Sequence, residues 1–145
     1  MSKDRKLPTT VSFVSQKGGV GKSSLARLTA VGGAHRGLNA LLADFDLEQL
    51  TCVEWAALRM RGSIEPTIDA RPFKSLKKLR KSDEGFDLII ADTRGLAEDL
   101  SHEIAEISDV VFLPTGASGD DLEPAELQQL EAALGVPVRV IWQRI

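Results

Sequence analysis

The chain has 145 residues, a formal net charge of −3, 43% apolar residues and 27% charged residues. This composition is typical of a globular domain, and the chain is long enough to bury about two-thirds of its unfolded surface. It excludes a membrane-spanning helix, because no apolar run approaches the roughly 20 residues needed. A lone cysteine, Cys52, excludes an internal disulfide and predicts a reducing, cytoplasmic setting.

Apolar runs alternate with amphipathic segments along the chain. Residues 1–9 are expected to form a flexible tail, and residues 10–145 one domain. Strands are predicted at Thr10–Ser15, Leu38–Ala43, Phe86–Ala91, Val110–Leu113 and Val138–Trp142, with a short extended piece at Thr67–Ala70. Helices are predicted from Lys22 onward and at Leu50–Met60, Phe73–Lys81, Leu96–Ile107 and Leu122–Leu134. This alternation predicts an α/β fold with a mostly parallel sheet and helices on both faces.

The spacing of apolar residues also predicts which helix faces are buried. In the helix that follows Lys22, the expected inward residues are Leu25, Leu28 and Val31, and Gly37 is the expected stop. In the next helix they are Val53, Ala56, Ala57 and Met60. Phe73–Lys81 places Phe73, Leu76 and Leu79 inward, and its outer face is basic.

A glycine-rich stretch, Ser15–Ser24, joins the first strand to the first helix. Backbone N–H groups in such a turn, together with the helix N-terminus, can bind a phosphate. Lys22 is suited to reach β- and γ-phosphates, and the Ser23 hydroxyl to bind Mg²⁺. A purely structural turn is the alternative, which the Lys22–Ser23 pair disfavours. The predicted phosphate-binding residues are Gly18, Gly19, Val20, Gly21, Lys22, Ser23 and Ser24.

Aspartates follow two of the predicted strands. Asp44 and Asp46 come after the second strand, and Asp92 ends the strand Phe86–Ala91. Because ligands bind beyond the carboxyl ends of parallel strands, these side chains are expected beside the glycine-rich loop. Oxygen ligands suit Mg²⁺, so Ser23, Asp44 and Asp92 are its predicted ligands. Asp44 and Asp46 would point the same way in an extended chain, one toward the metal shell and the other toward an attacking water. The alternative for each aspartate is a turn or a helix cap.

Three motifs carry a resemblance to a known family. The stretch Lys17–Ser23 resembles the deviant Walker A motif of ParA/MinD ATPases, in which the first glycine is replaced, here by Gln16, and a signature lysine stands at Lys17. Leu41–Gln49 resembles the family's strand ending in Asp-x-Asp-Pro-Gln, and Phe86–Thr93 its Walker B strand. Val110–Pro114 and Val140–Arg144 resemble the strands beside its adenine pocket, with Gln143 as a base-reading candidate. The match spans residues 10–145 and is most similar to small plasmid-partition ATPases.

The resemblance implies a P-loop NTPase fold with ATP and Mg²⁺ as cofactors. It implies catalytic roles for Lys17, Lys22 and Asp46. Lys17 would contact the nucleotide of a second subunit, so that ATP holds a homodimer together and slow, partner-stimulated hydrolysis releases it. The implied partner is a ParB-type centromere-binding adaptor. The implied process is plasmid or chromosome partition in the cytoplasm, on the nucleoid.

The chain also departs from the family pattern. Leu47 and Glu48 replace Pro-Gln, and Arg94 replaces a proline; Arg94 contacts phosphate, contacts a partner subunit or, as favoured here, faces solvent. These departures support a second hypothesis: a non-hydrolysing ATP-binding regulator, scaffold or degenerate fragment. Family members usually continue beyond the position of Ile145, so we expect the chain to be either a fragment whose domain is incomplete at its C-terminus or a minimal variant.

Two further functions are weighed from the residues. The five basic residues of the Lys74–Lys81 segment are a candidate for sequence-independent DNA contact, although a solvated face is the simpler interpretation. A MinD-like membrane cycle ranks last, because no C-terminal amphipathic helix is present to lie on a bilayer.

Overall fold

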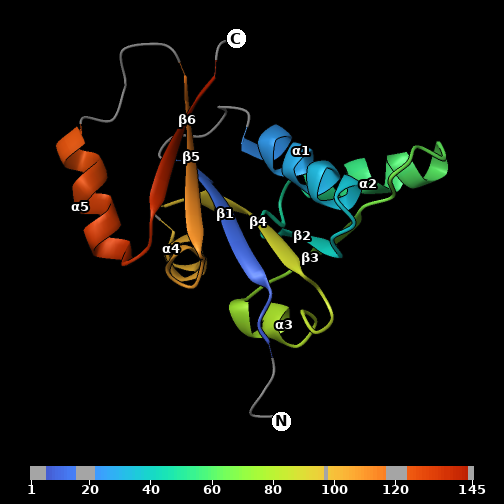
Figure 1. The fold of residues 1–145 in the computed structure, drawn as a ribbon, viewed down its shortest axis with the longest axis horizontal. Coiled ribbons are helices and arrows are strands. Elements are labelled where there is room, and N and C mark those ends of the chain that lie inside the picture. The colour runs from blue at the N-terminus through green and yellow to red at the C-terminus, as the bar shows by residue number, and fades with distance from the viewer. Residues whose placement is uncertain (1–5, 16–21, 97, 117–123, 144–145) are drawn as a thin grey trace.

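The central element of the computed structural model, which describes residues 6–15, 22–96, 98–116 and 124–143, is a six-stranded sheet (Figure 1). The strand order is β3-β2-β4-β1-β5-β6, and every neighbouring pair is parallel. The strands are β1 (Thr9–Ser15), β2 (Ala40–Asp44), β3 (Asp69–Pro72), β4 (Leu88–Gly95), β5 (Val110–Gly116) and β6 (Val138–Gln143). The predicted α/β fold with a parallel sheet is confirmed.

Helices cover both faces of this sheet. They are α1 (Lys22–His35), α2 (Thr51–Arg61), α3 (Leu76–Arg80), α4 (Asp99–Glu106) and α5 (Pro124–Leu134). The cluster that contains Leu42 packs against α1 and α2, whereas the cluster that contains Leu41 packs against α3 and α4. A third cluster lies beneath α4 and α5. Successive strand residues therefore face opposite cores, which explains why these strands are continuously apolar. No helix in the described ranges is long and apolar enough to cross a membrane.

Helix α1 buries a different face from the one that the sequence predicts. Its buried residues are Ala26, Ala30 and Gly33, whereas Leu28 is 66% exposed, so the inward orientation predicted for Leu28 is wrong. The small residues let the helix approach the sheet closely: a Cβ on Gly33 would lie 3.1 Å from Leu88 Cδ2. Close approach selects small side chains over large ones, which apolar spacing alone cannot show. Gly37, with φ of +80°, follows the helix in the left-handed conformation expected of a stop.

Helix α2 is rotated in a similar way. Cys52 and Ala56 face the core, whereas Ala57 is exposed and Met60 is 65% exposed. The inward orientations predicted for Ala57 and Met60 are therefore wrong, whereas the one predicted for Ala56 is confirmed. Backbone N–H groups at the N-terminus of α2 donate to the carboxylate of Asp44, the last residue of β2. This attachment, and not the apolar spacing, decides which side of the helix faces the sheet.

The basic segment forms a shorter helix than predicted. Ser75 Oγ accepts a hydrogen bond from Lys78 N at 3.1 Å and caps the first turn, so α3 extends only from Leu76 to Arg80. Lys74 and Lys81 consequently lie outside the helix. Arg80 Nη1 pairs with the buried Asp83 Oδ2 at 2.8 Å. One of the five basic charges is therefore already neutralised within the chain.

Substitution of two leucines tests the orientation of α1. We expect Leu42→Ala to lower the free energy of unfolding by about 2–5 kcal/mol, because it removes a fully buried side chain and leaves a cavity. Leu28→Ala should change it by less than about 0.5 kcal/mol. Urea unfolding followed by circular dichroism measures both values. Equal losses for the two variants would contradict the exposed position of Leu28.

Candidate functional site

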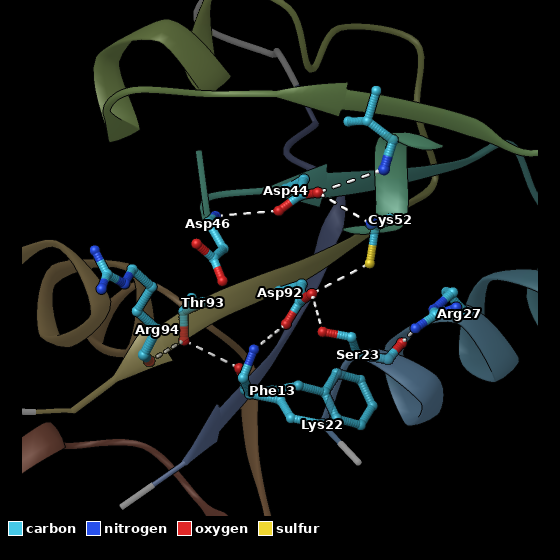
Figure 2. A network of polar contacts seen from close by, with 11 residues as sticks. Phe13, Lys22, Ser23, Arg27, Asp44, Asp46, Cys52, Asp92, Thr93 and Arg94 are labelled. Atoms are coloured by element: carbon cyan, nitrogen blue, oxygen red, sulfur yellow. Dashed lines mark hydrogen bonds and ion pairs between the residues drawn. The ribbon is translucent and has the colours of Figure 1, made fainter. Parts of the chain in front are cut away.

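Three side chains meet at the carboxyl ends of β1 and β4 (Figure 2). Lys22 Nζ forms an ion pair with Asp92 Oδ1, and Ser23 Oγ donates a hydrogen bond to Asp92 Oδ2 at 2.8 Å. Asp92 is 1% exposed, so its charge depends on these partners rather than on bulk water. Lys22 and Ser23 begin α1, directly after the glycine-rich stretch. The fold therefore brings Lys22 and Ser23, which are adjacent in the sequence, to the distant Asp92.

Asp44 lies beside Asp92 on the neighbouring strand β2. One of its oxygens, Oδ2, accepts hydrogen bonds from Cys52 N at 3.2 Å and Val53 N at 3.4 Å. Asp44 therefore caps the N-terminus of α2, where backbone N–H groups would otherwise lack partners. Burial, together with the nearby charge of Asp92, raises the pKa of Asp44. The helix-cap alternative left open by the sequence is present in the structure, and a contact of Asp44 with the metal shell stays a prediction.

Asp46 lies just beyond the end of β2. The strand ends at Asp44, and the Asp46 N–H donates to Asp44 Oδ1 at 3.1 Å. That the two carboxylates point the same way stays a prediction. Asp46 Oδ1 is buried and has no hydrogen-bond partner among the described residues. A buried carboxylate oxygen of this kind calls for a water or a ligand to satisfy it.

Cys52 joins the two buried carboxylates, a role that the sequence does not reveal. Its Sγ donates to Asp92 Oδ2 at 3.1 Å, while its backbone N–H donates to Asp44. Burial raises the pKa of the Cys52 thiol, and the negative charge of Asp92 raises it further. The thiol therefore stays protonated at neutral pH and remains a donor. No local pattern could have found this contact, because it links α2 to a strand 40 positions away.

Two of the residues that depart from the family motifs, Glu48 and Arg94, form an ion pair with each other. Arg94 Nη2 lies 3.4 Å from Glu48 Oε2, and Arg94 Nε lies 3.4 Å from Glu98 Oε1. All three side chains are substantially exposed, so these pairs contribute little stability. The sequence favoured a solvent-facing Arg94; the structure adds that its charge is shared between two glutamates.

Several predicted site residues cannot be placed in this arrangement. Lys17, Gly18, Gly19, Val20 and Gly21 lie outside the described residues. Ser24 is exposed in the first turn of α1, and the backbone of Gln143 ends β6, but the Gln143 side chain is outside the described part of the chain. The roles of these residues stay predictions.

The donor set that the described residues present suits a magnesium–nucleotide pair. Ser23 contributes a hydroxyl, and Asp46 and Asp92 contribute carboxylate oxygens. Within the described ranges no group of three or more His, Cys, Asp or Glu side chains is arranged around a metal position. Mg²⁺ keeps several waters and needs only one or two protein ligands, so this sparse oxygen set fits it. Lys22 and the N-terminus of α1 supply positive charge suited to a phosphate.

No model of a known protein family matches the chain. Among curated proteins, "Protein virC1" of Rhizobium radiobacter is 28% identical over 149 residues. The alignment covers 93% of this chain and 64% of that protein, so the chain spans less than two-thirds of its relative.

Solved structures share the fold at low sequence identity. A plasmid partition protein from Borrelia burgdorferi is 17% identical with a TM-score of 0.69, over 94% of this chain and 79% of that one. A ParA family ATPase from Chlorobium tepidum is 20% identical with a TM-score of 0.56, over 93% and 73%. Cobyrinic acid a,c-diamide synthase from Mycobacterium smegmatis, with bound ADP and magnesium, is 15% identical with a TM-score of 0.69, over 94% and 74%. The chain therefore has a P-loop NTPase fold, and its resemblance to ParA/MinD-type ATPases is confirmed.

Thiol reactivity tests the position of Cys52. We expect the native protein to react with DTNB at pH 8 at least about a hundredfold more slowly than the protein in guanidinium chloride, because the thiol is buried and protonated. Absorbance of the released thionitrobenzoate measures the rate. Cys52→Ser is the matched blank, since Cys52 is the chain's one cysteine. Rapid stoichiometric reaction of the folded protein would contradict the buried contact with Asp92.

Proposed function

We propose that the chain is an ATP-binding, weakly hydrolysing switch of the ParA/MinD type that serves plasmid or chromosome partition. One observation carries this proposal: Lys22 and Ser23, which begin α1, both contact the buried carboxylate of Asp92. The shared fold with a partition protein and a ParA family ATPase supports it. The proposed domain comprises residues 9–145, because β1 begins at Thr9 and not at Thr10 as the sequence predicts, and residues 1–8 are the proposed tail.

Asp92 prepares the site for a charged ligand. It holds the Lys22 ammonium and the Ser23 hydroxyl at the N-terminus of α1, so both groups are positioned before a ligand arrives. Ser23, Asp44 and Asp92 are the proposed residues that would hold Mg²⁺, directly or through water, and the bound ion would supply positive charge that compensates the phosphates. Lys22, released from Asp92, would contact the phosphates, and the backbone from Gly18 to Ser24 would surround them.

Asp46 is the proposed residue that orients the attacking water. Its buried Oδ1 lacks a partner among the described residues and therefore has the capacity to accept a hydrogen bond from a water. Lys17 is proposed to add a second cation from the other subunit of an ATP-dependent homodimer. This charge would compensate the phosphates in a way that one subunit alone cannot.

The partners and cellular location of the proposed switch rest on the family resemblance and not on contacts at the site. A ParB-type adaptor would stimulate hydrolysis, and the protein would act in the cytoplasm on the nucleoid without a membrane-bound stage. Non-specific DNA contact would use Lys74, Lys77, Lys78 and Lys81, which are all exposed. Because Arg80 is paired with Asp83, this surface carries less free charge than the sequence alone implies.

A second candidate function is an ATP-binding regulator or scaffold that does not hydrolyse ATP. The pairing of Arg94 with Glu48 favours it, because this acid stands where the resembled family has the glutamine of its Asp-x-Asp-Pro-Gln motif. The two candidates differ in turnover and agree in nucleotide binding.

Steady-state ATPase assays with matched variants separate the two candidates. We expect Asp46→Asn to lower kcat by about 10²–10⁴-fold with little change in ATP affinity, because the isosteric amide keeps the shape and loses the base. Lys22→Ala should weaken ATP binding itself, measured by isothermal titration calorimetry. Tight ATP binding by the wild type with no turnover, with and without DNA, would favour the regulator.

Light scattering with and without ATP and Mg²⁺ tests the role of Lys17. We expect the wild-type mass to double on addition of ATP and the Lys17→Ala variant to stay monomeric, because it lacks the proposed intersubunit phosphate contact. Lys6→Ala, near the N-terminus and remote in sequence from the loop, is the charge-matched control. ATP-dependent dimerisation that survives in Lys17→Ala would rule out the proposed contact.

A further inference from the structure

A groove of about 390 Å³ runs between α1 and α2, which lie next to one another on one face of the sheet (Figure 1). The described residues that line it are Ser24, Arg27, Leu28, Val31, Trp55 and Arg59. Val31 and Trp55 are partly buried against the core, whereas Leu28 is largely exposed. The groove therefore has an apolar floor and an apolar residue on its rim. Apart from Ser24, which is a predicted phosphate-binding residue, neither the site above nor the proposed function uses the residues that line it.

The two arginines of the groove are placed around one aromatic ring. The guanidinium carbons of Arg27 and Arg59 lie 5.8 and 5.1 Å from the centroid of the Trp55 ring, within the range of cation–π contact. Arg27 Nε donates to the Ser23 carbonyl at 3.2 Å, and Arg59 Nη2 donates to the Pro66 carbonyl at 3.0 Å. Ring and carbonyl contacts together hold both guanidinium groups in place, so an incoming ligand does not have to order them.

The charge of these arginines is not neutralised within the described part of the chain. No carboxylate of the described residues forms an ion pair with Arg27 or Arg59, and none of the described lining residues is acidic. Two like charges held near the same ring favour an anionic ligand. In contrast, the other arginines named above, Arg80 and Arg94, both have carboxylate partners. The groove is thus a basic site within a chain whose net charge is −3.

We propose that this groove binds an acidic amphipathic helix of a partner protein. Trp and Arg are enriched at the energetic centres of protein interfaces, and a groove between two helices accepts a third helix through apolar anchors at i, i+3, i+4 and i+7. Glutamate or aspartate beside those anchors would pair with Arg27 and Arg59. Duplex DNA could supply the negative charge, but its backbone offers no apolar group to cover Leu28 and Val31. The apolar floor therefore favours a protein ligand.

The groove shares structural supports with the polar site. Its α1 wall carries Ser23, which donates to Asp92, and Arg27 donates to the Ser23 carbonyl (Figure 2). Its α2 wall carries Cys52, which donates to the same carboxylate. A helix bound in the groove would therefore contact both elements that meet on Asp92. The docking proposal does not depend on nucleotide turnover and can be tested without ATP.

Peptide binding with charge-reversed variants tests the proposal. The probe is a fluorescein-labelled amphipathic peptide of about 18 residues with leucine anchors and glutamate on the flanking positions, and the control peptide has lysine for each glutamate. Fluorescence anisotropy should give a micromolar Kd for the acidic peptide and much weaker binding of the basic one. Leu28→Glu should weaken binding of the acidic peptide by at least about tenfold, whereas Leu28→Lys should not.

Further variants separate this surface from other basic surfaces. Arg27→Gln with Arg59→Gln should also weaken binding by at least about tenfold, while Lys77→Gln with Lys78→Gln, which removes two charges from α3, should change it by less than about twofold. Leu28 is exposed, so its variants keep the test valid even if the arginine variants unfold. Absence of saturable binding, equal effects of Leu28→Glu and Leu28→Lys, or a DNA duplex that binds with the same dependence on Arg27 and Arg59 would overturn the proposal.

Discussion

The structure is built around one buried negative charge. Asp92 lies within the central strand β4, out of contact with water, and an uncompensated carboxylate there would be costly. Lys22, Ser23 and Cys52 compensate it, and they come from the starts of two different helices. The position of α1 and that of α2 therefore both depend on this carboxylate. The same arrangement makes the site sensitive to any ligand that competes for Lys22 or Ser23.

Asp44 extends this principle to the next strand. It caps α2 through the backbone of Cys52 and Val53, and burial together with the nearby negative charge of Asp92 raises the pKa of Asp44. Two neighbouring buried carboxylates repel one another, so the chain places hydrogen-bond donors around both. The outcome is a polar layer at the carboxyl edge of a sheet whose remaining core is apolar. Such edges are where α/β proteins bind ligands, and the residues found here suit a phosphate and a hard cation.

The surface of α1 and α2 shows a second consequence of this packing. Close approach of α1 to the sheet buries Ala26 and Ala30, which leaves Leu28 on the outside. The same rotation places Arg27 beside Trp55, where Arg59 also lies. The orientation of α1 thus decides both which of its residues pack in the core and which line the groove. The arginines of this groove have no carboxylate partner among the described residues.

The sequence by itself determined the alternation of strands and helices, the polar residues at the strand ends and the glycine-rich loop before Lys22. These features are local: buried strands are apolar runs, helices repeat at 3.6 residues, and ligand-binding residues follow strands. Only the tertiary structure decided which faces of α1 and α2 are buried, that Asp44 caps the N-terminus of α2, and that Cys52 bonds to Asp92. Each depends on strand register and on how closely a helix approaches the sheet. Those quantities arise between segments distant in the chain, so no periodicity within one segment encodes them.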